Sequence, residues 1–306
     1  MSYTRFLIIA NKWFEADPLM DVLSNATARP PVIQDLGTVL WPRAQQTKLS
    51  DIIVRPRCAV NLGGDFVMEV WCLQDLMNPF LSYANTAEKI RVLPQIFTYG
   101  KMPDFVMAFG TAATPSAEPG AGNVVIGPDI FIHNPFSGKP NPASAWNDPA
   151  VMEKRLRSSV APAFFRALDV NTAFQTAVSE KLLTPPLCPA SPHALNVSSE
   201  NVAVSDINVT STSDYTWADP ESLAAASAAG ISSVASMETT HGTIRAQSEA
   251  PFLFVSGITN QVGQFGTQVV PKFYAQNFVA SHNAAIAVAW LIPEIMAYLK
   301  AGEPPH

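Results

Sequence analysis

The residues best suited to chemistry lie next to short apolar runs that have the composition of buried strands. Gly110, Thr111 and two alanines follow the run Phe105–Phe109, and small residues at a strand end let a ligand approach the backbone closely. Two carboxylates, Glu15 and Glu238, stand beside other segments of this kind. Carboxylates accept hydrogen bonds from hydroxyl groups, so these positions suit the binding of a small polar ligand.

Several common kinds of site are missing from the sequence. The five histidines show no i, i+3 or i, i+4 pairing and the three cysteines form no C-x-x-C pair, so neither a metal nor a disulfide framework is expected. The serine-hydrolase pattern Gly-x-Ser-x-Gly and the phosphate-loop pattern are also absent. The net charge of -6, with no cluster of Lys and Arg, argues against binding to nucleic acid.

The elements that must position these residues alternate between strand-like and helix-like segments, which is typical of an open α/β sheet. We expect strands at 6–10, 58–62, 66–73 (a hairpin with the preceding run), 105–109, 123–132, 202–209, 232–236 and 252–258. We expect helices at 16–23 with Pro18 in the first turn, from the N-cap Thr86 to a kink or end at Pro94, at 150–168 broken at Pro162, at 170–183, 220–229 and 239–247, and at 274–300. A chain of 306 residues is long enough for two domains, but the Pro- and Ser-rich stretch 184–199 is short, and we expect one domain over residues 1–306.

The sequence predicts a cytoplasmic protein. The first apolar run has only five residues, which is too short for the core of a signal peptide. The longest apolar stretch, 284–299, is interrupted by Pro293 and Glu294 and falls short of the roughly 18 residues of a membrane span. We therefore expect no membrane partner.

Four segments, in their order and separation, resemble the nucleoside phosphorylase and nucleosidase superfamily, in particular its methylthioadenosine/adenosylhomocysteine nucleosidase branch. The segments are Ile8–Ala10 with Glu15 and Leu19, Asp104–Ala113 followed by Gly127-Pro128-Asp129, Ser236–Thr240, and Val255–Asn260. The resemblance covers about residues 5–300. It implies a single-domain, three-layer α/β/α fold with a central mixed twisted sheet, a homo-oligomer (a dimer or trimer), a small-molecule nucleoside as substrate and no cofactor.

The same resemblance assigns roles in the cleavage of a bond between ribose and a base. Glu15 corresponds to the glutamate that orients the attacking water as general base, and Glu238 to the carboxylate that binds the ribose hydroxyls, with Met237 against the sugar. Asn260 stands where many members carry an acidic proton donor to the base, and an amide cannot donate that proton. This departure indicates either a preference for 6-oxopurines or reduced activity. The plainer alternatives are that Glu15 and Glu238 are ordinary carboxylates at helix starts.

The remaining candidates concern the nucleophile and the base. Thr111, with the backbone N–H groups of Ala112 and its neighbour, corresponds to the residues that hold water or phosphate, although the segment could be a simple turn. Tyr215 and Trp217 are candidates for stacking on the base or for covering the edge of the core. His241, one helical turn after Glu238, is more often a structural residue in such a place. His133 and Asn134 match the sugar-binding residues only loosely.

The leading hypothesis is therefore hydrolysis of a purine nucleoside or a 5′-modified relative, because the segment after the first strand lacks the glycine-rich, arginine-containing pattern of the phosphorylases. The alternative is a phosphorylase with inorganic phosphate as co-substrate. Its arginine would come from Arg43, Arg55, Arg57 or Arg91. A nucleoside-binding module with little catalysis, or a likeness in fold alone, also remains open.

Overall fold

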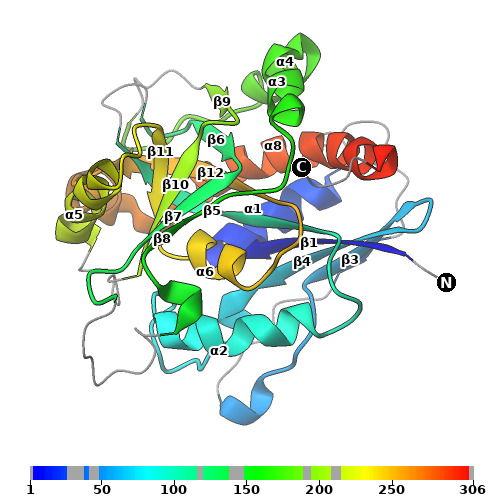
Figure 1. Cartoon of the computed structure of the whole chain (residues 1–306), viewed down its shortest axis with the longest axis horizontal. Coiled ribbons are helices and arrows are strands. Elements are labelled where there is room, and N and C mark those ends of the chain that lie inside the picture. Colours follow the sequence, from blue (N-terminus) through cyan, green and yellow to red (C-terminus); the bar gives the residue numbers. More distant parts are fainter. Residues whose placement is uncertain are drawn as a thin grey trace.

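In the computed structural model, the strand-like runs of the sequence pair into one mixed sheet (Figure 1). The structure describes residues 3–25, 38–40, 48–115, 120–137, 148–188, 194–207 and 215–302, and no side chain of 38–40 or 215–219 is among the described ones. Arg43, one of the arginines named above, lies outside these residues.

The centre of the sheet is made of parallel strands. β1 (Thr4–Ala10) pairs in parallel with β4 (Phe66–Cys72) and with β5 (Phe105–Thr114), and β5 also pairs in parallel with β12 (Phe252–Gln261). These strands are buried on both faces, which explains their almost continuous apolar sequence. The other strands are β2 (Thr38–Leu40), β3 (Cys58–Gly63), β6 (Val124–Gly127), β7 (Asp129–His133), β8 (Lys154–Leu156), β9 (Leu195–Val197), β10 (Val202–Asp206) and β11 (Val234–Glu238).

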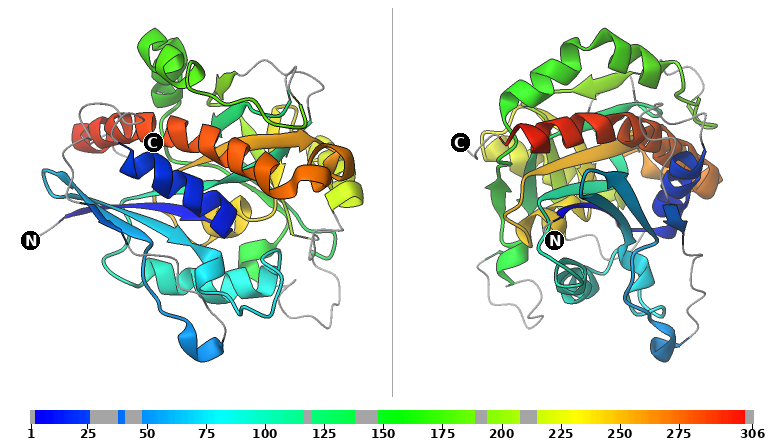
Figure 2. Two further views of the ribbon diagram at one scale, coloured as in Figure 1. Left: turned by 180° about the vertical axis from the view of Figure 1, so that it is seen from behind. Right: turned by 90° about the vertical axis from the view of Figure 1, so that its right-hand side faces the viewer.

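Helices cover both faces of the sheet, and the predicted three-layer α/β/α architecture is confirmed (Figure 2). α1 (Trp13–Ser24), α3 (Pro162–Val170), α4 (Thr172–Ser179) and α8 (Phe273–Ala301) share one core with every second residue of β1, beginning at Phe6. α2 (Thr86–Phe97) and α6 (His241–Ala246) share the core of the opposite face with the alternate residues of β1, beginning at Leu7. α5 (Tyr215–Ala228) packs beside β10, and the short α7 (Phe265–Gln268) follows β12.

The segment of α7 and α8, Phe265–Ala301, is the one helical stretch of the described residues that is long and apolar enough to cross a membrane. Half of its most apolar window is buried in the fold. A Cβ atom added at Gly257 of β12 would lie 2.0 Å from the carbonyl oxygen of Ala280, so α8 packs directly on the sheet backbone. A core helix passes the same test of length and composition, and the packing of α8 is of that kind.

The predicted helix over 150–168 is wrong. That segment contains a single 3-10 turn at Pro149–Val151, then β8, and only then α3, which has Pro162 in its first turn. The reason is a tertiary contact: Arg155 and the backbone N–H of Ser158 both bind the Asp129 carboxylate, which holds this stretch along the edge of the sheet.

Several boundaries also differ from the prediction. The expected strand 123–132 is two strands, β6 and β7, and α2 is capped by the side chain of Asn85 rather than Thr86. α1 begins at Trp13, so Pro18 lies in its second turn. β5 and β12 both extend past their predicted ends, to Thr114 and Gln261, because each continues to pair with the other.

Candidate active site

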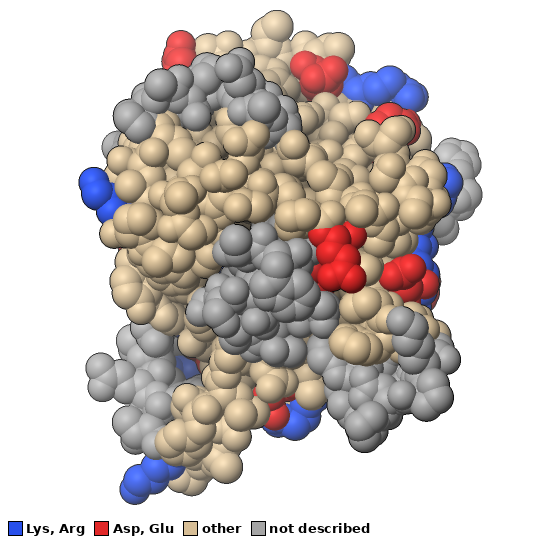
Figure 3. Space-filling view, turned by 90° about the vertical axis from the view of Figure 1, so that its left-hand side faces the viewer, with Lys and Arg blue, Asp and Glu red and all other residues tan. Residues whose placement is uncertain are grey.

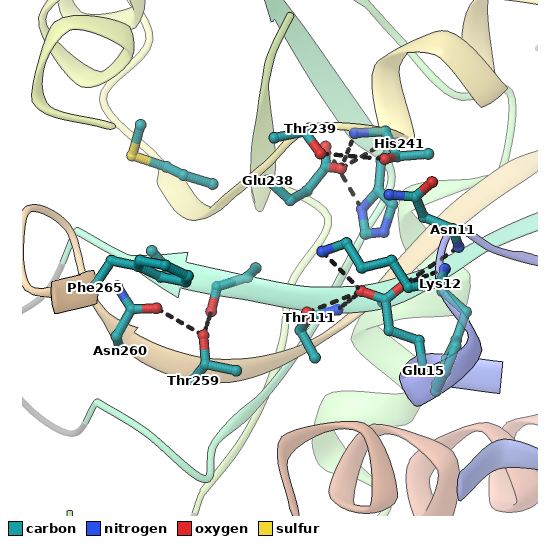
Figure 4. Close-up of a pocket in the computed structure, with 16 residues that line it drawn as sticks. Asn11, Lys12, Glu15, Thr111, Glu238, Thr239, His241, Thr259, Asn260 and Phe265 are labelled. Carbon is teal, nitrogen blue, oxygen red and sulfur yellow. Dashed lines mark hydrogen bonds and ion pairs between the residues drawn. The ribbon is translucent and has the colours of Figure 1, made fainter. Parts of the chain in front are cut away.

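The carboxyl ends of β1, β5, β11 and β12 meet around one cavity, the place where ligands bind in open α/β sheets. The cavity has a volume of about 40 Å³, which is room for about two or three water molecules. It is lined by Asn11, Lys12, Glu15, Phe109, Gly110, Thr111, Ala112, Ala113, Met237, Glu238, Thr239, Thr240, His241, Thr259, Asn260 and Phe265 (Figure 4). Six of the eight residues predicted for the site are among them.

Glu15 is held by four hydrogen bonds and is 1% exposed. Its Oε1 accepts from the backbone N–H of Thr111 at 2.9 Å and from the Thr111 hydroxyl at 2.8 Å. Its Oε2 accepts from the backbone N–H groups of Asn11 and Lys12, both at 3.1 Å, and the Lys12 ammonium lies 3.5 Å from Oε1. The carboxylate therefore ties the start of α1 to the end of β5, and its acceptor positions are occupied.

Gly110 makes this close approach possible. A Cβ atom at this position would lie 3.1 Å from Oε1 and 3.3 Å from Cδ of Glu15, which is tighter than ordinary contact. Thr111, predicted to follow the end of its strand, lies inside β5. Its hydroxyl donates to Glu15, and its oxygen lone pairs can accept a further hydrogen bond.

Glu238 is the last residue of β11 and precedes the start of α6. The same side chain can therefore stabilise the start of the helix and bind a ligand. It accepts hydrogen bonds from the Ser205 hydroxyl, from the backbone N–H of Thr240, and from the backbone N–H of His241 at 2.8 Å. Gly242 donates its N–H to Ser205 Oγ at 2.7 Å, and this close approach needs glycine because a Cβ atom there would lie 2.7 Å from Ser205 Cβ. The carboxylate is fixed by the N-terminus of α6 and still borders the cavity.

Asn260 belongs to β12 instead of following it. The register between β12 and β5 shifts at Thr259, and such a bulge redirects the side chains that follow. The Thr259 hydroxyl donates to Asn260 Oδ1 at 2.7 Å, and Asn260 Nδ2 donates to the carbonyl of Gln261 at 2.6 Å. One N–H and one lone pair of the amide remain for a ligand, and Met237 borders the same space.

Two lysines that the sequence analysis did not select lie at the site. Lys12 lines the cavity, and its ammonium also stands 5.3 Å from the ring centres of Phe14 and Tyr83. Lys89 of α2 is fully buried, and its ammonium donates to the carbonyl of Thr239 at 2.8 Å and to its hydroxyl at 3.2 Å. Burial, with the charge of Lys12, lowers the pKa of Lys89 to about 7.

Asn11 and His241 bring polar atoms to the cavity that have no hydrogen-bond partner within the described parts of the chain. For Asn11 these are both amide atoms, and for His241 the ring atom Nδ1. Both side chains are at least 97% buried. Burial lowers the pKa of His241, so its ring is neutral at neutral pH.

A second and larger cavity adjoins the first, because Phe265 borders both. Its volume is about 590 Å³, which is large enough for a small organic ligand. The lining consists mainly of aromatic side chains: Trp13, Phe14, Gln74, Tyr83, Phe265, Val270, Phe273 and Tyr274. Among the described aromatic residues, Phe109 and Phe265 line the first cavity, and Phe265 links it to the other rings of the second.

Four further candidate residues are not among the described residues that line the cavity. Tyr215 and Trp217 begin α5, but their side chains are outside the described ones. His133 Nδ1 lies 3.1 Å from a carboxylate oxygen of Glu153, and the Asn134 amide donates to the carbonyl of Val151. Neither residue lines the cavity.

Among the described residues, the candidate arginines of a phosphate site also lie elsewhere. Arg57 forms ion pairs with Asp17 and Asp75, and Arg91 forms one with Glu88. Arg55 does not line the cavity either. In the parts of the chain that the structure covers, no group of three or more His, Cys, Asp or Glu side chains could hold a metal ion.

Comparison with known proteins gives a result at the level of structure. No protein-family model and no curated protein matches the sequence. The 5′-methylthioadenosine/S-adenosylhomocysteine nucleosidase of Helicobacter pylori is similar in structure with a TM-score of 0.56 and 9% identity, covering 96% of this chain and 100% of that one. The chain has the nucleoside phosphorylase and nucleosidase fold.

Two further structures of this fold are similar to nearly the same extent. The S-adenosylhomocysteine nucleosidase of Streptococcus pyogenes gives a TM-score of 0.54 at 11% identity and covers 95% of this chain and 97% of its own. The futalosine hydrolase of Helicobacter pylori gives 0.53 at 9% identity, covering 95% and 98%. Such low identities leave the substrate to be argued from this chain's own nucleosidase-fold site.

Proposed function

We propose that the protein hydrolyses the N-glycosidic bond of a purine nucleoside or a 5′-modified nucleoside. The observation that carries the proposal is the convergence of Glu15, Glu238 and Asn260, from three distant parts of the sequence, on one cavity. Figure 4 places Asn260 and Phe265 at one end of the cavity and Asn11, Lys12 and His241 at the other. The structural likeness to nucleosidases supports the same reaction class.

A ribose needs more room than the first cavity offers, so the sugar would lie between its two ends and extend into the adjoining larger cavity, with its hydroxyls toward Glu238. The negative charge of Glu238 favours the positive charge that develops on the sugar as the bond breaks. The leaving base would lie toward the amide of Asn260 and the aromatic cavity, and water would approach from the end with Thr111. No step of this scheme requires a cofactor.

Water is favoured over phosphate as the nucleophile because of the charges around the cavity. Two carboxylates border it, and Lys12 is the one Lys or Arg among its described lining residues, where it is already paired with Glu15. A phosphate dianion would meet net repulsion in such a place.

The partners proposed are a small-molecule nucleoside and further copies of the same chain, as a dimer or trimer. Val270 and Tyr274, beside the aromatic cavity, are more than half exposed, which supports an oligomer that covers them. On the face shown in Figure 3, charged side chains of both signs are few and scattered among the described residues. This supports the expectation that nucleic acid is not a partner.

The proposal is tested by incubating the purified protein with adenosine, inosine, guanosine and methylthioadenosine, with and without phosphate. Free base is then measured by chromatography. Release without phosphate is the expected result, and release that depends on phosphate would establish a phosphorylase instead. Binding without release, seen as a raised melting temperature, would favour a nucleoside-binding module.

A further inference from the structure

The sequence resemblance assigns to Glu15 the role of the general base that activates water. The structure leaves this carboxylate little capacity for that role. All four of its hydrogen bonds come from protein donors, and three of these donors are backbone N–H groups fixed by the fold. An ionised carboxylate has about four lone-pair sites, so a water molecule would have to displace one of these bonds. The ammonium of Lys12 also forms an ion pair with Oε1, at 3.5 Å.

His241 has the opposite surroundings. It lines the same cavity, and its Nδ1 has no hydrogen-bond partner among the described residues. Nδ1 lies 3.9 Å from Glu238 Oε1, so a proton on Nδ1 faces a carboxylate and the lone pair is left on Nε2. The ring is kept in place by stacking on Phe254, with 6.0 Å between ring centres. A carboxylate beside one nitrogen and a lone pair on the other is the arrangement of a general base.

Asn11 supplies a second, independent observation at the same end of the cavity. Both polar atoms of its amide are buried without a partner in the described parts of the chain. Leaving two such atoms unsatisfied is unfavourable, so a ligand or water is expected to bind them. The volume of about 40 Å³ fits water at this place, and Asn11 and His241 both line this cavity (Figure 4).

We infer that His241, oriented by Glu238, takes the proton of the attacking water, and that Asn11 positions this water. The inference rests on the proposed hydrolysis of a nucleoside. Glu15 is then a positioning residue, which fixes Thr111 and the backbone of Asn11.

In this step the water oxygen forms a bond to the anomeric carbon, and one water proton passes to Nε2 of His241. The electron pair of the glycosidic bond stays on the nitrogen of the leaving base, which Asn260 holds by its free N–H. The base takes a proton from solvent water, and the imidazolium later returns its proton to solvent. The products are the free sugar and the free base.

The step requires the neutral ring, so activity should fall at acidic pH as His241 takes up a proton. The charged groups around the ring are Glu238, Glu15 and Lys12 at the cavity, and Lys89 on α2. The carboxylates favour the protonated ring, whereas burial and the two lysines oppose it, and burial is the largest of these effects.

The experiment compares wild type, His241→Gln and His241→Ala, with His282→Ala as the control because His282 lies on α8 and outside the cavity lining. For each, kcat, KM and the pH dependence of base release are measured without phosphate, and nucleoside binding is measured by equilibrium dialysis. We expect kcat to fall about 100-fold or more in His241→Gln, with binding nearly unchanged and the acidic limb of the pH profile lost. Added imidazole should restore activity to His241→Ala and have no effect on the control.

A His241→Gln protein that keeps kcat within about threefold of wild type would overturn the inference. So would a folded His241→Ala protein whose residual activity keeps the wild-type acidic limb and does not respond to imidazole. If wild type itself releases no base, it is the proposed function that fails, and the two failures are thereby distinguished. Asn11→Ala, which leaves the ring intact, should lower kcat about tenfold without changing the pH profile.

Discussion

Replacement of Glu15 by Gln tests the role of the most heavily hydrogen-bonded side chain of the site. The glutamine has nearly the same shape but only one acceptor oxygen. If that oxygen takes the place of Oε1, the NH₂ group, a hydrogen-bond donor, faces the backbone N–H groups of Asn11 and Lys12, which are also donors and then have no acceptor. If it takes the place of Oε2, the NH₂ group faces the backbone N–H of Thr111 and the ammonium of Lys12.

Either orientation leaves at least one buried backbone donor without an acceptor, which costs about 1–3 kcal/mol. Removing the carboxylate from the buried pair with Lys12 brings the expected loss to about 3–5 kcal/mol in the free energy of unfolding. Urea unfolding followed by circular dichroism measures it. Glu221→Gln removes the same charge from an exposed place on α5, and should stay within about 0.5 kcal/mol of wild type.

The reasoning is refuted if Glu15→Gln unfolds at the same urea concentration as the control. That outcome would mean that the carboxylate is not needed to join α1 to β5, and that a purely catalytic role is the better account. Loss of activity without loss of stability would point in the same direction and count against His241 as the base.

Three further predictions concern the surroundings of the site. Gly257→Ala should destabilise the protein by at least about 3 kcal/mol in urea unfolding, since its Cβ would lie 2.0 Å from the carbonyl oxygen of Ala280, and unchanged stability would contradict the packing of α8. Asn260→Asp introduces a group that can carry a proton to the leaving base, and kcat for base release should rise about tenfold or more at acidic pH; an equal or lower kcat would show that the amide is not at the base. At a pH between about 7, the lowered pKa of Lys89, and its ordinary pKa, this side chain binds fewer protons in the folded than in the unfolded protein. The free energy of unfolding of wild type, relative to that of Lys89→Met, should therefore rise with pH above 7, by up to about 1.4 kcal/mol per pH unit. Parallel curves of stability against pH for the two proteins would exclude this.

The layers of the fold could be predicted because its central strands are continuous apolar runs. Phe6–Ala10 and Phe252–Ile258 are buried on both faces, and their composition indicates a sheet covered on both sides. The helix over 150–168 could not be corrected from sequence, because the Asp129 carboxylate that holds this segment extended is more than twenty residues away. Local patterns do not contain such a tertiary contact.

The residues of the site were predicted in part for the same reason. Glu15 lies in the first turn of the helix that follows β1, and Glu238 and Asn260 lie in the last residues of their strands. The parallel strands β1, β5 and β12 bring their carboxyl ends together, and the end of β11 meets the end of β5 there. Lys89 was not predicted as a site residue, although its position relative to the apolar residues of its helix indicates that it is buried. It shares a helix face with Leu93 and Ile96, and a lysine on such a face needs a buried partner.

Asn11 and His241 could not have been selected from their types alone. A polar residue after a strand and a lone histidine on a short helix are usually structural. Their significance comes from atoms that the described structure leaves without a partner, and this depends on the packing of α6 against β1 and β5.

The two carboxylates of the site are held in the same way from opposite faces of the sheet. Glu15 accepts from backbone N–H groups at the start of α1, and Glu238 accepts from backbone N–H groups at the start of α6. Helix N-termini fix these charges without a dedicated cation at each. Lys12 balances one of them, whereas Lys89 gives up its proton near neutral pH. The field in the cavity therefore favours a sugar with developing positive charge over an incoming anion, and this is the physical reason to expect water rather than phosphate as the nucleophile.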